Sequence, residues 1–226
     1  NSSFVNRITD ESISIDELIR DPVEAVSNFD PIPHPRIPLP VDLYRSQQQA
    51  RDNSMGLNLA NDDQLRELAA AINNAGAGSW TAGPLVPGAN PTGENIAVTN
   101  PADRREVVGH WQGADNATVE RALQNAVAAH AGWDATPAGA RAAILEHAAD
   151  LLEARMPAYM AMCTKEAGKT LPDGIAEVRE AVDFLRYYAL QAREHFAPIA
   201  LPGPTGESNQ LQLGGRGVFV CISPWN

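Results

Sequence analysis

The chain has 226 residues, 44% hydrophobic and 20% charged, which is typical of a folded globular protein with one sizeable core, or one domain and part of another. Its formal net charge of −11 argues against nucleic-acid contact from this segment, because such contact would need a basic patch. No apolar run reaches transmembrane length, no secretory leader is recognisable, and Cys163 and Cys221 make no disulfide framework, so a cytoplasmic location is expected.

The first sixty residues predict short helices and a connector. Ser14 followed by Glu17 has the pattern of a helix N-cap, and Asp21-Pro22 indicates the start of a second short helix. Residues 30–44 contain alternating prolines, which remove backbone donors and fix φ, so an extended, polyproline-like chain is expected. A ligand for a proline-binding module is one interpretation, and a stiff connector is the simpler one.

The middle of the chain predicts one helix and a pair of strands. Asn61 is placed to cap a helix whose apolar residues recur at helical spacing and which fades near Gly76. Residues 79–95 are rich in Pro and Gly and are expected to form a loop. Residues 96–99 and 106–111 then predict two short strands around an Asn-Pro-Ala-Asp turn.

Four further helices are predicted between residues 116 and 196. The first begins at Asn116, the second starts with Thr136 as cap and Pro137 at its first position, and the third is closed by Gly168. Apolar stripes are expected on three of them: Val119, Ala122, Leu123, Ala126 and Val127; Ile144, Leu145, Ala148, Leu151 and Leu152; and, on the last, Ile175, Val178, Val182, Leu185 and Ala189.

The last helix has a second stripe, roughly opposite the first, made of Glu177, Glu180, Phe184, Tyr187 and Gln191. A solvated acidic face is one interpretation. Two aromatic residues on the same face argue instead that part of it is covered. A carboxylate one turn from an aromatic ring could receive a substrate that carries an ammonium group.

The end of the chain predicts a buried strand that leads into a site. Residues 210–213 form a candidate edge strand, and residues 217–222 form an apolar run between Gly and Pro that is typical of a buried strand. Ligands bind at the C-terminal ends of strands in open α/β sheets. The carboxamide of Asn226 could donate a hydrogen bond to a developing oxyanion there, or it could simply form the turn.

Other motifs are rejected. Gly168-Lys169-Thr170 lacks the upstream glycine and strand of a phosphate-binding loop, and the glycines at 214–217 precede a strand instead of following one. Cys163 lies in an apolar helical context that favours a core residue over a nucleophile. The five histidines have no metal-ligand spacing, so no metal site is predicted.

Several motifs together resemble the aldehyde dehydrogenase superfamily. They are Asn100-Pro101-Ala102, Trp133 with Pro137 and Arg141, residues 166–169, residues 184–189 and the run 217–226 that ends in Pro-Trp-Asn. Residues 166–170, 175–184 and 221–226 further resemble the bifunctional proline utilization A family. Residues 1–8 resemble the segment that closes that family's proline dehydrogenase barrel, and residues 33–40 and 52–61 resemble its linker.

The resemblance implies an α/β fold: an aldehyde dehydrogenase-like, Rossmann-type domain, represented by its N-terminal helices and first core strand and preceded by the end of a (β/α)8 barrel. Residues 1–29 would end the barrel, 30–61 would be a Pro-rich linker, and 62–226 would begin the dehydrogenase domain. The chain would thus be an internal segment of a longer polypeptide and inactive alone. The full-length protein is expected to be a homo-oligomer that acts on small molecules, and peripheral membrane association of that parent protein is a further expectation.

The resemblance also implies a two-step oxidation: FAD-dependent oxidation of proline, then NAD-dependent oxidation of glutamate γ-semialdehyde through a cysteine thiohemiacetal. Asn226 matches the oxyanion-stabilising Asn, and Ile222, Ser223, Pro224 and Trp225 match the stretch that lines NAD. Glu180 falls where the family presents a carboxylate to the substrate amino group. The nucleophilic Cys, the general base and the FAD site would lie outside these 226 residues. The alternatives are a single-function aldehyde dehydrogenase and a non-catalytic interaction module.

Overall fold

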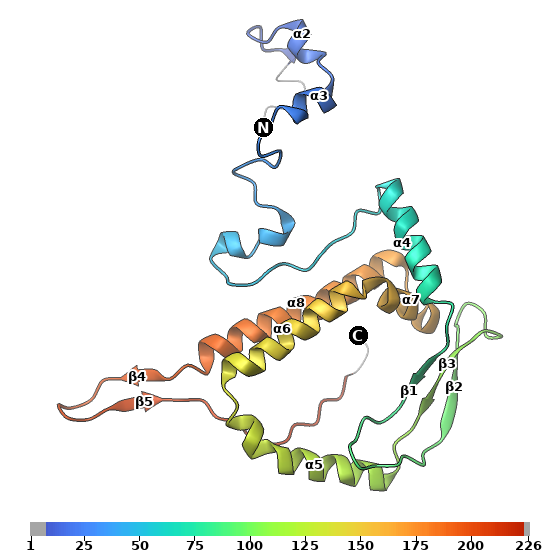
Figure 1. Ribbon diagram of the computed structural model, residues 1–226, viewed down its shortest axis with the longest axis vertical. Helices are drawn as coiled ribbons and strands as arrows, with labels where there is room; N and C mark the ends of the chain where they lie inside the picture. The colour runs from blue at the N-terminus through green and yellow to red at the C-terminus, as the bar shows by residue number, and fades with distance from the viewer. Residues whose placement is uncertain (1–7, 224–226) are drawn as a thin grey trace. The chain divides into compact units, whose positions relative to one another are not determined.

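The computed structural model describes residues 8–223, and the chain divides into two units, Asn1–Gln49 and Ala50–Asn226 (Figure 1). In the first unit, α2 (Ile15–Leu18) and α3 (Pro22–Ser27) are single short turns of helix. Both predicted caps are confirmed, because Ser14 Oγ accepts from Glu17 N at 3.2 Å and Asp21 Oδ1 accepts from Val23 N at 2.8 Å. Neither helix buries a residue.

The proline-rich stretch is not the extended chain that its sequence predicts. Ile37 N donates to His34 O at 3.1 Å, and Asp42 N donates to Leu39 O at 2.9 Å. Short 3-10 helices follow, η1 (Pro40–Asp42) and η2 (Arg45–Gln47). The prediction was wrong because the residues between the prolines keep their N–H donors, and these close turns onto carbonyls three residues back.

Between residues 50 and 223 the second unit contains five long helices, and all five were predicted. Three of them begin at side-chain caps: Asn61 Oδ1 accepts from two backbone N–H groups, Asp115 Oδ1 accepts from Thr118 N, and Thr170 forms a capping box with Asp173. No helix in the described residues is both long and apolar enough to cross a membrane. The bounds are α4 Asp62–Ala75, α5 Asn116–Asp134, α6 Ala138–Ala154, α7 Met156–Ala167 and α8 Leu171–His195.

The predicted cap of α6 is wrong. Thr136 does not cap that helix; its Oγ1 donates instead to Gly132 O at 2.9 Å, and Pro137 occupies the N-cap position without a side-chain hydrogen bond. Helix α5 ends only at Asp134, so the hydroxyl lies close to a carbonyl of the preceding turn and satisfies it.

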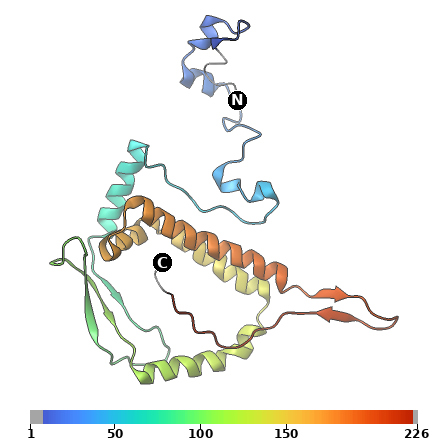
Figure 2. The same ribbon diagram turned by 180° about the vertical axis from the view of Figure 1, so that it is seen from behind.

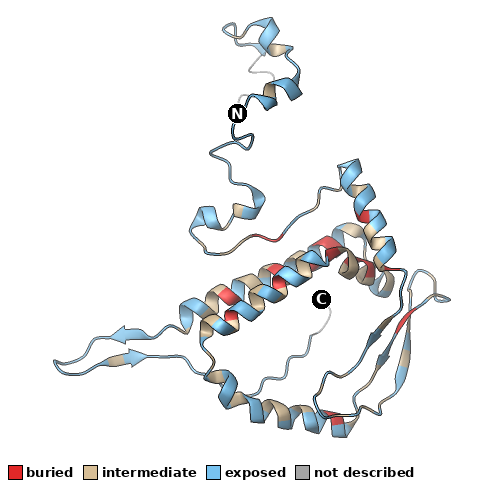
Figure 3. Ribbon diagram, viewed as in Figure 1, coloured by how far each residue is buried: buried red, intermediate tan, exposed pale blue. Residues whose placement is uncertain are grey.

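The core lies where α8 packs against α6 and α7, with α4 against α7 (Figures 1 and 2). The predicted stripe of α8 is confirmed, since Ile175, Val178, Val182 and Ala189 are buried and Leu185 packs against them. Met156 and Met160 of α7 and Leu68 of α4 complete the cluster. Figure 3 shows these buried positions along the facing sides of the helices.

Helix α6 meets α8 mainly through alanines outside its predicted stripe, although Leu152 of that stripe packs against the core cluster. Ala142 and Ala149 are fully buried, whereas Ile144 is 54% exposed and Leu151 43% exposed. Small side chains let the two helix axes approach closely, so the alanine face was selected over the larger apolar residues. The described residues also leave the predicted stripe of α5 exposed: Val119, Leu123 and Val127 all face solvent.

A three-stranded mixed sheet packs beside α7. Strands β2 (Asn95–Thr99) and β3 (Val107–Gln112) form the predicted antiparallel pair, and β1 (Trp80–Ala82) pairs with β3 in parallel. The sequence missed β1 because three residues between glycines are too short to show alternation. In a separate hairpin, β4 (Ile199–Leu201) pairs with β5 (Asn209–Leu211). Of the strand predicted at residues 210–213, residues 210 and 211 are therefore confirmed.

The end of α7 provides a test of backbone conformation. Gly168 has φ +66° in the left-handed region, and a Cβ there would lie 3.1 Å from Pro101 Cγ. Gly168→Ala should therefore lower the free energy of unfolding by roughly 1–2 kcal/mol. Gly132→Ala is the matched control, because Gly132 is within α5 with open space around it, and it should be neutral or stabilising by about 0.5–1 kcal/mol. Urea unfolding of both variants measures the two changes in the free energy of unfolding. Equal changes in the two variants would contradict the prediction.

Candidate functional site

Helix α8 places Glu180 on an exposed face, as predicted from the second stripe. Within residues 8–223, the Glu180 carboxylate makes no hydrogen bond or ion pair, and its exposed position leaves it available to a ligand. Glu177, one turn earlier, is instead committed to an ion pair with Lys169. The two carboxylates of this stripe therefore differ in what they can bind.

An aromatic group follows Glu180 on the same helix. The rings of Phe184 and Tyr188 stack with centroids 6.0 Å apart, and Tyr187 meets Tyr188 edge-on at 5.2 Å. The Arg51 guanidinium lies 5.6 Å from the centre of the Tyr187 ring. Phe184 is 51% exposed and Tyr187 39% exposed, so the described residues leave most of this aromatic face uncovered. Glu180 thus stands beside a surface of exposed rings.

Residues 51–59, here called the strap, contact helix α8 through Ser54 and the hydrophobic core through two leucines. Ser54 N donates to Asp183 Oδ1 at 2.9 Å, and Ser54 Oγ donates to Asp183 Oδ2 at 2.7 Å. Arg179 Nε donates to Ser54 Oγ at 3.1 Å. Leu57 and Leu59 pack against the hydrophobic cluster. The sequence indicated only an irregular segment here, because these bonds join residues more than a hundred positions apart.

A second carboxylate holds the strap from α6. Glu153 Oε1 accepts from Met55 N at 2.5 Å, and Glu153 Oε2 accepts from Arg186 at 3.0 Å. Arg186 also bonds Asp150 Oδ1 at 3.0 Å. Burial acts to lower the pKa of Arg186, but the hydrogen bonds that its guanidinium donates to Glu153 and Asp150 outweigh burial and raise that pKa. The strap, α6 and α8 are therefore joined by one polar network.

The predicted core strand at residues 217–222 is not formed. Residues 212–223 have no strand pairing, and Ile222 is 85% exposed. A buried strand needs hydrogen-bonded neighbours and covering helices, and within the described residues no strand lies beside it. The segment is anchored at its start, where Gly215 N donates to Asp134 Oδ1 at 2.5 Å.

The other site residues of the sequence prediction lie at the end of the chain. Ser223 is exposed like Ile222, and the backbone groups of both make no hydrogen bond within residues 8–223. Pro224, Trp225 and Asn226 lie outside the described residues. No hydrogen bond or ion pair in the described part of the chain joins Glu180 to Ile222 or Ser223. The role predicted for each remains a prediction.

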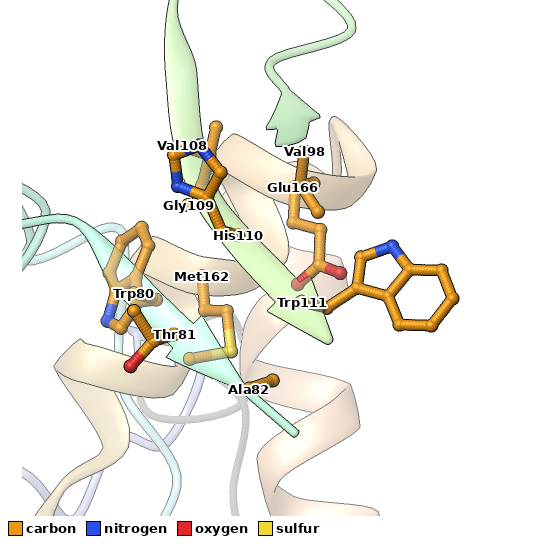
Figure 4. Close-up of a pocket in the computed structure, with 10 residues that line it drawn as sticks. All are labelled: Trp80, Thr81, Ala82, Val98, Val108, Gly109, His110, Trp111, Met162 and Glu166. Carbon is orange, nitrogen blue, oxygen red and sulfur yellow. The ribbon is translucent and has the colours of Figure 1, made fainter. Parts of the chain in front are cut away.

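A pocket that the sequence did not indicate lies between β1, β3 and α7 (Figure 4). Figure 4 shows the Glu166 carboxylate beside Trp111, with Trp80 on the other side of Met162. Of the predicted site residues that the structure describes, Glu180, Ile222 and Ser223 do not line it. It was missed because β1, which supplies Trp80, was taken for loop.

Two lysines, Lys165 within α7 and Lys169 just after its end, are paired with groups that hold the fold together. Lys165 Nζ donates to Gly76 O and to Glu106 Oε1, both at 2.7 Å, which ties α4 and the β2–β3 hairpin to α7. The Lys165 bond, with a second from Asn100, lowers the pKa of Glu106. Lys169, in the rejected phosphate-loop motif, follows the left-handed cap Gly168 and pairs with Glu177.

Cys163 lies within α7, as its helical context predicts, and is partly buried. Burial raises the pKa of its thiol, and the nearby Glu177 charge adds to that shift. A raised pKa disfavours the thiolate, which is the nucleophilic form of cysteine. Cys163 therefore has the properties of a structural residue.

The comparisons with known proteins agree with these features. The model of the aldehyde dehydrogenase family matches residues 89–226. The chain is 44% identical over its whole length to the bifunctional protein PutA of Klebsiella aerogenes, of which it spans 16%. It is 39% identical over 60% of its length to a 1-pyrroline-5-carboxylate dehydrogenase of Anoxybacillus flavithermus, of which it spans 26%.

A solved structure gives the same result for the fold. The crystal structure of a bifunctional proline utilization A protein superposes with a TM-score of 0.65 and 38% identity, covering 96% of this chain and 19% of that one. The helices and mixed sheet of the second unit have the α/β fold of an aldehyde dehydrogenase domain. The chain belongs to the aldehyde dehydrogenase family.

Proposed function

We propose that this chain is part of a bifunctional proline-catabolic enzyme. That enzyme would oxidise proline to pyrroline carboxylate with FAD and then oxidise glutamate γ-semialdehyde to glutamate with NAD. The observation that supports this most strongly is similarity to bifunctional PutA over 100% of the chain, including the residues before the family match. A single-function 1-pyrroline-5-carboxylate dehydrogenase is the second candidate, but such relatives match only 60% of the chain.

The domain assignment is part of the proposal. Residues 1–29 would close a proline dehydrogenase barrel, 30–61 would link the two halves, and 62–226 would begin the aldehyde dehydrogenase domain. The low content of buried residues in the first unit supports a connecting role for its proline-rich part. The complete protein would act on small molecules as a homo-oligomer. Two free cysteines support a reducing, cytoplasmic environment.

Glu180 would receive the ammonium group of glutamate γ-semialdehyde. Its carboxylate is exposed, has no internal partner among the described residues, and adjoins aromatic rings that can pack against an apolar substrate chain. A charge-assisted hydrogen bond between carboxylate and ammonium would distinguish this substrate from aldehydes without an amino group. The neighbouring Glu177 is engaged by Lys169 and is less suited to that task.

Residues 222–226 would serve the dehydrogenase cofactor and the reacting carbonyl. The backbone groups of Ile222 and Ser223 are left without partners in the described residues, which fits a segment that binds a nucleotide through its main chain. Pro224 and Trp225 would complete this lining. NAD, when bound, would accept a hydride from the substrate. Asn226 would donate its amide N–H to the oxyanion that forms after attack by a cysteine elsewhere in the enzyme. No residue of this chain is assigned to FAD.

The substrate role of Glu180 is tested by Glu180→Ala in the complete enzyme. The KM for glutamate γ-semialdehyde should rise about 10-fold, because one charge-assisted hydrogen bond is lost, while kcat should change little. Steady-state NAD reduction measures both constants. Glu194→Ala, at an exposed position near the end of α8, is the matched control. An unchanged KM for the Glu180 variant would show that this carboxylate does not bind substrate.

A further inference from the structure

The strap contacts α8 at one residue before Glu180 in the sequence and at one residue after it. Arg179 precedes Glu180, Asp183 follows it by three residues, and both bond the same buried residue, Ser54, which is 2% exposed. Arg51 then lies over Tyr187, one turn further along. Figure 3 shows a short buried stretch within this loop, whose other residues are exposed or of intermediate burial. The three contacts follow i, i+4, i+8 spacing and therefore form one line along the helix.

This line is separate from the one that packs into the core. At roughly 100° per residue, Arg179, Asp183 and Tyr187 cover an arc of about 80°, and Glu180 lies about 20° beyond Tyr187. The buried residues Ile175, Val178 and Val182 lie on the other side of Arg179. The strap thus occupies the sector of the helix between the buried stripe and Glu180.

We infer that the strap positions Glu180 for substrate, with Ser54 as the positioning residue; this inference rests on the proposed function. Apolar packing along one stripe is not directional and allows a helix to rotate slightly about its axis. The paired bonds from Ser54 N and Oγ to both oxygens of Asp183 are directional and lie off that stripe. Together the two lines fix the rotation of α8, and with it the direction of the Glu180 side chain.

The energetics favour a rigid contact. Ser54 Oγ donates its one O–H to Asp183 and accepts from Arg179, so its donor and one acceptor position are used at a residue that is only 2% exposed. Removing the hydroxyl would leave a guanidinium donor and a carboxylate oxygen without this partner. Helix α8 would then adjust to restore their pairing, and Glu180 would move with its neighbours. A substrate contact tolerates such movement poorly.

The test is Ser54→Ala in the complete enzyme, assayed with two substrates. One is glutamate γ-semialdehyde, and the other is glutarate semialdehyde, which lacks only the α-amino group. The KM for the amino substrate should rise roughly 3- to 10-fold, less than the ~10²-fold that a 1 Å misplacement can cost. The KM for glutarate semialdehyde and both kcat values should stay within about twofold. Ser54→Thr keeps a hydroxyl, so its KM for the amino substrate should lie much closer to that of the unmodified enzyme than the KM of Ser54→Ala does.

Further variants separate positioning from a general loss of structure. Asp183→Asn disturbs the same contact from α8 and should reproduce the selective rise in KM, so the test survives if Ser54→Ala folds poorly. Ser79→Ala, at an exposed serine outside the strap, is the matched control. In a Glu180→Ala background, Ser54→Ala should raise KM no further, because both changes act through the same carboxylate.

The outcomes are distinguishable. A rise in KM equal for both substrates, no rise, or additivity with Glu180→Ala would overturn the inference. If Glu180→Ala raises KM selectively but neither strap variant does, the proposed function stands and the strap only stabilises the fold. If Glu180→Ala itself has no effect, the substrate role of Glu180 is wrong and the inference falls with it.

Discussion

Asn226→Ala is expected to lower the kcat of NAD-dependent semialdehyde oxidation by about 10²–10³-fold, because one hydrogen-bond donor to the developing oxyanion is lost. The donor is proposed to act mainly in the transition state, so the KM for the semialdehyde should change far less. Steady-state NAD reduction by the complete enzyme measures both constants. This is the largest effect on activity that we expect from a single residue of the chain.

Two further variants sharpen this prediction. Asn226→Asp places an acceptor where a donor is needed and should be at least as damaging as alanine. Asn73→Ala, at an exposed position of α4, is the matched control and should leave kcat unchanged. If Asn226→Ala kept kcat within about threefold of the unmodified enzyme, Asn226 would be a turn residue and the oxyanion role would be rejected.

The largest effect on stability is expected from Met160→Ala. Met160 is fully buried in the cluster that joins α7 to α8, and a Cβ added at Gly174 would lie only 3.3 Å from its Cγ. Truncation would remove apolar contacts and leave a cavity that closely packed helices cannot fill. The free energy of unfolding should fall by about 2–5 kcal/mol. Urea denaturation, followed by helical circular dichroism, measures the change.

Met55→Ala is the matched control for Met160→Ala. It removes the same atoms from a side chain that is 49% exposed, so the free energy of unfolding should change by less than about 0.5 kcal/mol. The denaturant slope should be the same in both variants, since each alters stability without altering the surface exposed on unfolding. Equal losses in the two variants would mean that Met160 is not a core residue in solution.

Local interactions explain why the sequence predicted much of the fold. The caps at Ser14 and Asn61 bond backbone groups two or three residues away, so their geometry follows from neighbouring residue types. The buried stripe of α8 follows from helical periodicity. The β2–β3 hairpin follows from two β-prone runs around a turn. Glu180 could be singled out for the same reason, as a carboxylate on the face opposite an apolar stripe.

Contacts between distant segments decided the rest. The sequence by itself determined where the helices begin and end and which face of α8 is buried, because those features depend on nearest neighbours along the chain. Only the tertiary structure decided that α6 uses Ala142 and Ala149 against α8, that β1 pairs with β3, and that Ser54 bonds Asp183. Each of these contacts depends on how closely two segments that are far apart in the sequence approach each other. The spacing of apolar and polar residues within either segment does not encode that approach.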